Sequence, residues 1–176
     1  MCIIVPDNDQ KDSLRKTMKL TDKEASEYLQ RCYTAVDGLW FVKVEEKSGF
    51  DTALNIDEEV WKVVPKIQAR FLKNKLKRDC GLEALLECFS AKLKLDGFKF
   101  KTNKTGSTVK ITISTCPWHN IMIKSSRTSL SEKIGSRICA VECSVWADEF
   151  GKNISFEPKD KICKGDPSCI IIFKAG

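Results

Sequence analysis

The chain has 176 residues, of which 42% are hydrophobic and 31% charged, so it can bury a core as one domain, or as one domain with a helical extension. No apolar run approaches the roughly 18 residues of a membrane span, and the short stretch Cys2 to Val5 lacks the basic flank and length of a signal peptide. The net charge of +6 lacks the basic stripe with interleaved aromatics typical of nucleic-acid-binding proteins. We therefore expect a cytoplasmic protein with no membrane and no nucleic-acid partner.

The N-terminal third predicts helices. The first twenty residues are polar and expected to be loose, and Thr21 with Glu24 then forms a capping box ahead of an apolar pattern at helical spacing. That helix is expected to run to Gly49, with a break at Asp37-Gly38.

Two more helices are expected before residue 96. Asp57 is the expected cap of the first, which runs through Trp61, Val64, Ile67, Phe71 and Leu72. Pro65 is expected to kink this helix, or to mark its first turn if the helix starts late. The second spans Leu82 to Leu95, where five apolar side chains share one face: Leu82, Leu85, Leu86, Phe89 and Leu93.

The period then changes from helical to alternating. Phe98 to Lys101 and Thr108 to Ile113 alternate apolar and polar residues, which predicts two half-buried strands joined by a hairpin turn at residues 103–107. A short helix is expected after Cys116-Pro117, and Ser131 is the expected cap of a longer one that ends at Gly151. Further strands are expected at residues 154–156 and 169–173.

This order of elements predicts an α+β fold, in which a helical N-terminal region is followed by an antiparallel sheet with helices packed on one face. The expected division is a helical region at residues 1–80 and an α+β domain at residues 81–176.

The strongest chemical signal is a set of nine cysteines, five of them at or after position 116. In a cytoplasmic protein such clusters more often bind metal or do thiol chemistry than form disulfides. Cys116, Cys139, Cys163 and Cys169 could supply four thiolates to zinc or to an iron–sulfur cluster. The alternative is that they are inert cysteines that pack as small hydrophobic residues.

A second possible site lies in the string Cys116-Pro117-Trp118-His119. Cys116 and His119 could form a nucleophile and general base pair, while the alternative for His119 is a hydrogen bond to backbone at the start of a helix. Trp118 and Trp146 could line an apolar ligand pocket, although both are equally expected in a plain core. Asp166, between Gly165 and Pro167, is the expected turn former.

The segment from about Leu82 to Phe173 resembles the 4-vinyl reductase-type domains and the related L-2-amino-thiazoline-4-carboxylic acid hydrolase-like family. The resemblance rests on Cys116-Pro117-Trp118-His119, on Arg137-Ile138-Cys139 and on the closing run Cys163-Lys164-Gly165-Asp166-Pro167-Ser168-Cys169, which an apolar strand follows. The N-terminal helices are similar to an uncharacterised anaerobe and archaeal branch of that group.

The resemblance implies a homodimer that holds a small apolar or aromatic ligand, and a zinc held by three cysteines and one acidic residue. By position those ligands fall on Cys139, Asp160, Cys163 and Cys169. Asp160 stands where the family has a longer glutamate, so Cys116 or Cys143 could take its place.

Two interpretations follow. In the first, the protein is a hydrolase-like enzyme that acts on a small sulfur- or nitrogen-containing compound, with an open metal site or Cys116, and with His119 as general base. In the second, it is a ligand-binding or sensor module in which four ligands close around a structural zinc or an iron–sulfur cluster.

Overall fold

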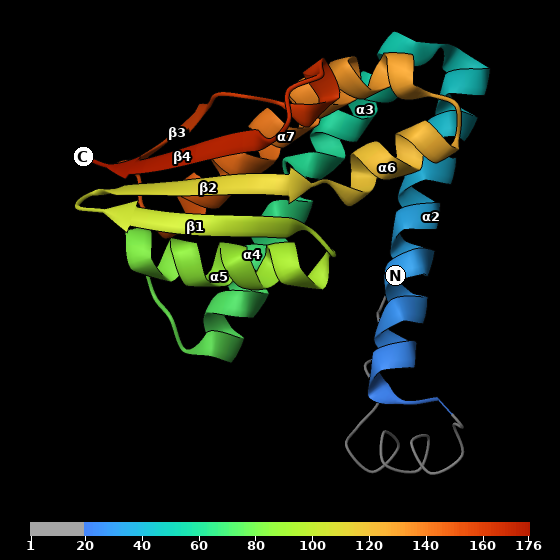
Figure 1. Ribbon diagram of the computed structural model, residues 1–176. Helices are drawn as coiled ribbons and strands as arrows, with labels where there is room; N and C mark the ends of the chain where they lie inside the picture. Colours follow the sequence, from blue (N-terminus) through green and yellow to red (C-terminus); the bar gives the residue numbers. More distant parts are fainter. Residues whose placement is uncertain (1–19) are drawn as a thin grey trace. The chain divides into compact units, whose positions relative to one another are not determined.

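The computed structural model describes residues 20–176, so the predicted loose segment at the N-terminus lies almost entirely outside the described residues. The helical region comprises α2 (Asp22–Ser48), α3 (Phe50–Trp61), α4 (Val64–Leu76) and α5 (Leu82–Leu95). After it come β1 (Lys99–Thr105), β2 (Thr108–Thr115), α6 (Pro117–Lys124), α7 (Thr128–Phe150), β3 (Ile154–Pro158), the 3₁₀ turn η1 (Ile162–Lys164) and β4 (Cys169–Ala175) (Figure 1).

The chain divides into two compact units, one ending at Lys43 and the other spanning Val44 to Gly176. The sequence had suggested a division after residue 80, but the division of the structure falls within α2. The reason is that α3 and α4 both pack against α7, and α4 also packs against α5. These helices therefore belong to the same unit as the sheet.

The capping box predicted at the start of α2 is confirmed. The backbone N–H of Thr21 donates to the carboxylate of Glu24 at 2.8 Å, and the N–H of Glu24 donates to the Thr21 hydroxyl at 3.3 Å. The predicted break at Asp37-Gly38 is wrong, because α2 runs without interruption to Ser48. One glycine costs a helix only about 1 kcal/mol, which a long helix tolerates.

Two predicted helix caps are wrong, because both residues lie inside helices. α3 begins at Phe50, directly after Gly49 with φ of +84°, so Asp57 lies in the middle of the helix on its buried side. α7 begins at Thr128, and Ser131 is buried one turn further on. In both cases a polar residue on the packed side of a helix resembled a helix start.

Four antiparallel strands form one sheet in the order β1-β2-β4-β3. Val109, Ile111 and Ile113 of β2 are buried on the face that meets α5 and α7, and Lys110 between them is exposed. The turn between β1 and β2 is tighter than predicted and occupies only residues 106 and 107, where Gly106 takes φ of +56°. The predicted α+β fold with its antiparallel sheet is confirmed.

Aromatic rings fill the core between the sheet and the helices. Phe89 of α5 packs edge-on against Trp146 of α7 at 5.2 Å and against Phe173 of β4 at 5.5 Å. Phe150 stacks on Trp146 at 5.8 Å. Burial of each such ring contributes about 1.5–3 kcal/mol, so these four residues hold α5, α7 and β4 together.

Candidate functional site

Cys116 lies where β2 gives way to α6. It is the N-cap residue of that helix, in an extended conformation, and Pro117 occupies the first helical turn as predicted. Burial, and to a lesser extent the neighbouring Cys169, raise the pKa of the Cys116 thiol to about 11. The backbone N–H groups of His119 and Trp118 act in the opposite direction, although the thiol makes no capping hydrogen bond. Without a metal, Cys116 is therefore a protonated thiol at neutral pH.

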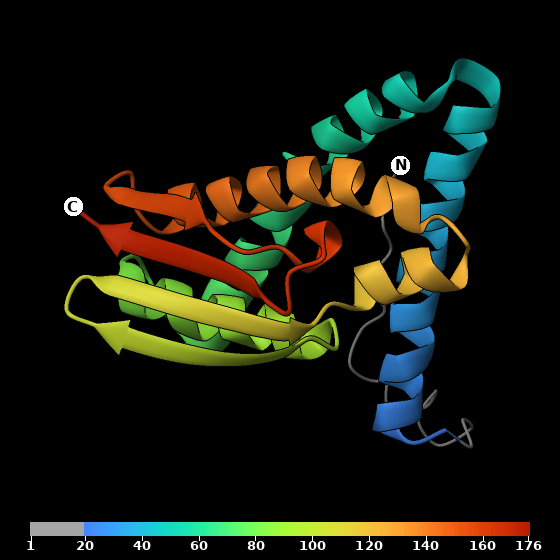
Figure 2. The ribbon, with the colours of Figure 1, turned by 45° about the horizontal axis from the view of Figure 1, so that its top comes forward.

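Cys163 and Cys169 lie on either side of a turn that packs beside α7 (Figures 1 and 2). The backbone N–H of Ile162 donates to Sγ of Cys169 at 3.2 Å. The carboxylate of Asp166 accepts from the backbone N–H of Lys161 at 2.8 Å, which confirms its predicted role as a turn former. The two thiols are thus held by a turn with its own internal hydrogen bonds.

Gly135 of α7 allows this turn to approach. A β-carbon at position 135 would lie 3.3 Å from Sγ of Cys163, a tighter contact than almost all real ones. Burial raises the pKa of Cys163, and the nearby Lys161 partly offsets that rise. A side chain larger than hydrogen at 135 would push Cys163 away from α7.

Cys139 is the central member of the group. It keeps accessible surface, but protein surrounds the thiol closely enough that loss of hydration strongly raises its pKa. The charges that raise it further are those of Glu142, Cys116, Cys169 and Cys163. The thiols of all four predicted metal ligands therefore act on one another across α7, the β2–α6 junction and the η1–β4 turn.

These side chains are gathered without forming a finished coordination shell. Within residues 20–176, no three or more His, Cys, Asp or Glu side chains are arranged so that they could hold a metal ion in this conformation. The four thiols lie in the same part of the protein and act on one another through their charges. To bind one metal ion together they would have to move closer to one another.

The two alternative ligands differ in their surroundings. Cys143 is buried within the hydrophobic core, one helical turn from Cys139. Asp160 is exposed, and its backbone carbonyl accepts a hydrogen bond from Ile170 at 3.0 Å. The carboxylate that acts most strongly on Cys139 and Cys143 is that of Glu142.

His119 is oriented by a buried hydroxyl. Its Nδ1 lies 2.8 Å from Oγ of Ser131, which α7 presents from its second turn. The sequence offered a hydrogen bond to backbone as the alternative to catalysis, and the partner found here is a side-chain hydroxyl instead. Among the hydrogen bonds of residues 20–176, none joins the imidazole to the Cys116 thiol.

The two tryptophans expected to line a pocket have different environments. Trp118 packs edge-on against Trp61 of α3, with ring centroids 6.1 Å apart. Trp146 has no exposed surface and belongs to the core, so its assignment to a pocket is corrected in favour of the core alternative. An open groove does lie between α5 and β1, and its lining contains neither tryptophan: Ser90, Lys94, Phe98, Lys99, Phe100, Lys101 and Thr102.

Next to the cysteines lies a buried ion cluster centred on Lys92. The Lys92 side chain is almost completely buried, with Nζ 2.5 Å from Oε1 of Glu142 and 3.1 Å from Oδ2 of Asp96. It also lies over the rings of Phe89 and Phe98, 5.7 and 5.3 Å from their centroids. Burial alone would lower the pKa of Lys92, but the charges of Glu142 and Asp96 outweigh it and raise the pKa.

Sequence reasoning passed over Lys92, although a signal was present. Lys92 falls on the apolar face of its helix, at helical spacing from Leu85, Cys88 and Phe89. A lysine at such a position is rarely buried without a carboxylate partner. The charge of Lys92 also reaches Cys116 and Cys143, where it favours the thiolate.

Comparison with known proteins places the chain in a family. The model of a family of unknown function, DUF6125, matches residues 12–167, and the chain belongs to that family. A comparison with curated proteins finds no match. Among the helices of residues 20–176, none is long and apolar enough to cross a membrane.

The raised pKa of Cys116 leads to a chemical prediction. In metal-free protein, iodoacetamide should modify Cys116 slowly at pH 7, and the rate should rise about tenfold per pH unit up to pH 9.5 because the thiolate is the reactive form. Peptide mass spectrometry measures the rate, with the exposed Cys80 as internal reference. Rapid modification at pH 7 that levels off by pH 8 would show instead an activated nucleophile.

Proposed function

We propose that the protein binds a metal, zinc in the first instance, through the thiols of Cys116, Cys139, Cys163 and Cys169. The observation that supports this most directly is the gathering of these four thiols from three separate segments of the chain, close enough that their charges act on one another. Soft thiolate donors favour zinc or iron–sulfur clusters over magnesium or calcium. The iron–sulfur cluster is therefore the alternative cofactor.

The energetics of the thiols predict how a metal would bind. Burial keeps these groups protonated, and ionised they would repel one another. A divalent cation would replace up to four protons and turn that repulsion into attraction, so binding should release protons and weaken as the pH falls. The Lys92 ammonium would offset part of the excess negative charge of a tetrathiolate site.

To bring the four thiols within bonding distance of one metal, the turn at η1 would move more than α7. The turn is a short 3₁₀ segment, whereas α7 is a 23-residue helix packed into the core. Gly135 already lets Cys163 lie close against α7, where a side chain would hold it away. The side chains of α7 would therefore keep their positions while Cys163 and Cys169 move towards them.

The same features favour binding over hydrolysis. A nucleophilic cysteine needs a lowered pKa, and that of Cys116 is raised. A general base must reach the proton that it removes, and within residues 20–176 no hydrogen bond joins the imidazole of His119 to the Cys116 thiol. We therefore favour a ligand-binding module with a closed, structural metal site, in keeping with the resemblance to 4-vinyl reductase-type and thiazoline hydrolase-like proteins. The small-molecule ligand and the homodimer that this resemblance implies are part of the proposal.

Metal analysis and an absorption spectrum of anaerobically purified protein test the proposal. We expect about one zinc per chain and no colour, as for a four-ligand structural site. Cys139→Ser and Cys169→Ser should each lower zinc affinity at least about tenfold, the scale set by loss of groups around a metal. Cys80→Ser is the matched control, because Cys80 is exposed and lies far along the chain from the four proposed ligands.

The alternatives give different results. A broad absorption band near 400 nm together with bound iron would show that the cofactor is an iron–sulfur cluster and not zinc. Asp160→Ala should leave zinc binding unchanged, whereas a loss equal to that of Cys139→Ser would assign the fourth ligand to Asp160. Protein without metal, and without affinity for added zinc, would overturn the proposal.

A further inference from the structure

A stripe of large apolar side chains runs along the outer face of α3 and α4. Its five members are exposed by between 37% and 64%: Ile56, Val60, Val63, Ile67 and Phe71. Their spacing of 4, 3, 4 and 4 residues places them on one face of a helix. Single exposed apolar residues are common, but a contiguous row of this kind marks a surface that binds another molecule.

The two helices follow each other in the chain with only Lys62 and Val63 between them, and are together called the rod. Lys62 and Val63, which link them, both keep right-handed helical dihedral angles, so the row continues across the junction. The opposite face is occupied, because Ala53, Leu54 and Trp61 of α3 are buried and the helix packs against α7. The stripe is thus fixed in orientation by the rest of the domain.

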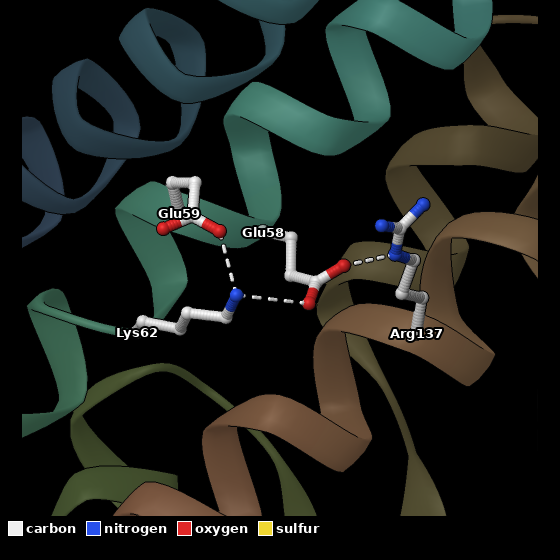
Figure 3. A network of polar contacts seen from close by, with 4 residues as sticks. All are labelled: Glu58, Glu59, Lys62 and Arg137. Atoms are coloured by element: carbon white, nitrogen blue, oxygen red, sulfur yellow. Dashed lines mark hydrogen bonds and ion pairs between the residues drawn. The ribbon is translucent and has the colours of Figure 1, made fainter.

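Polar contacts also hold α3 to α7. Figure 3 shows Lys62 between Glu59 and Glu58, and Glu58 paired in turn with Arg137 of α7. Nζ of Lys62 lies 2.6 Å from the carboxylate of Glu59 and 3.3 Å from that of Glu58. Glu58 is mostly buried by these contacts, whereas 70% of the Glu59 side chain is exposed at the edge of the stripe. Glu59 is therefore available to a partner, since an exposed pair such as Glu59 with Lys62 contributes little.

The charges along the rod separate into two halves. α3 carries acidic residues and no basic one, and α4 carries basic residues and no acidic one. Asp57 is buried and Glu58 pairs with Arg137, while Arg70 and Lys73 both contact Glu149 of α7. The charges left for a partner are therefore Asp51 and Glu59 on α3, and Lys66 and Lys75 on α4. A second copy laid antiparallel on the stripe would place each acidic half opposite a basic half, whereas parallel pairing would oppose like charges.

We propose that α3 and α4 form the interface of a homodimer, in which the stripe packs antiparallel on the same stripe of a second copy about a two-fold axis near Val63. The apolar residues are spaced almost evenly on both sides of Val63, as an isologous interface requires. Glu59 and the exposed Lys66, seven residues apart and so on the same side of the rod, would flank the stripe and pair across the axis. This inference rests on the homodimer in the proposed function but not on the metal.

The size of the stripe sets the expected affinity of the dimer. The 16 residues from Ile56 to Phe71 span about 24 Å of helix, so one helix pair lies at the small end of specific interfaces. We expect a dimer with a dissociation constant on the order of micromolar. Sedimentation velocity of the full chain from 1 to 200 µM should therefore show a concentration-dependent shift from monomer to dimer.

Charge reversal tests the geometry. Glu59→Lys and Lys66→Glu should each raise the dissociation constant at least about tenfold, because each opposes like charges across the axis, and the double variant should return it to within about threefold of the wild type. Val63→Glu should give monomer without a change in circular dichroism, since Val63 is exposed. Leu95→Glu, an exposed apolar residue of α5, is the control that should leave the dimer intact.

Two outcomes would overturn the inference in different ways. A protein that stays monomeric at 200 µM would rule out the homodimer itself. A dimer that persists in Val63→Glu and in both charge reversals would keep the homodimer and exclude this surface as its interface. Metal content measured on the same samples keeps either outcome separate from the metal-binding proposal.

Discussion

Replacement of Lys92 by methionine is expected to lower the free energy of unfolding by about 3–5 kcal/mol, the usual cost of removing one partner from a buried ion pair. Lys92 has only 2% of its surface exposed, and its ammonium compensates the carboxylate of Glu142 at 2.5 Å. Methionine fills a similar volume but leaves that carboxylate buried beside the thiols of Cys139 and Cys143. Urea denaturation at pH 7 and 25 °C measures the change.

Two further variants isolate the ion pair. Lys92→Met combined with Glu142→Gln should recover part of the lost stability, because no uncompensated charge then remains next to the cysteines. Lys152→Met, which breaks the exposed pair with Asp148, should cost less than about 1 kcal/mol. A loss below about 1 kcal/mol for Lys92→Met would mean that Glu142 is stabilised by other groups.

The same pair predicts a pH dependence. The pKa of Lys92 is raised in the folded protein, so the stabilisation is complete below the unfolded lysine value of about 10.4 and is lost as the pH rises towards the folded value. Buried thiols such as Cys116 also lose stabilisation at alkaline pH. The difference between wild type and Lys92→Met therefore reports on Lys92 together with its effect on these thiols, and it should shrink above pH 10.

Replacement of Trp146 by alanine is expected to cost about 3–5 kcal/mol, as for other large-to-small changes in a core. Trp146 is fully buried and contacts Phe89 edge-on and Phe150 face-on, so alanine would leave a cavity where α5, α7 and β4 meet. Urea denaturation at neutral pH measures the loss. A change within about 1 kcal/mol would show that the surrounding rings collapse into the cavity.

Trp146→Phe provides the matched comparison. Within residues 20–176 the indole N–H of Trp146 has no hydrogen-bond partner, so its removal breaks no hydrogen bond and abolishes an unpaired polar group. We expect a cost below about 1.5 kcal/mol, from packing alone. Leu95→Ala, at an exposed position, is the control for the loss of apolar atoms without a cavity.

Much of the local structure could be predicted from the sequence. The capping box at Thr21 and Glu24, the proline-started helix after Cys116 and the alternation of Val109, Ile111 and Ile113 each depend on neighbouring residues, and each was predicted correctly. The errors arose where a local pattern had two meanings. Ile67 and Phe71 have the spacing of a buried helix face but are exposed, because α4 turns its other side to α5 and α7.

The sequence by itself determined which cysteines stand at the ends of strands, in a turn and on a helix, and so which four were candidates for one site. Only the tertiary structure decided that they share a region, that Glu142 and Lys92 accompany them, and that Trp146 belongs to the core. The physical reason is that helix caps and strand alternation depend on residues within a few positions of one another. By contrast, the meeting of Cys116, Cys139 and Cys169 depends on how α7 packs against the sheet, which no local pattern encodes.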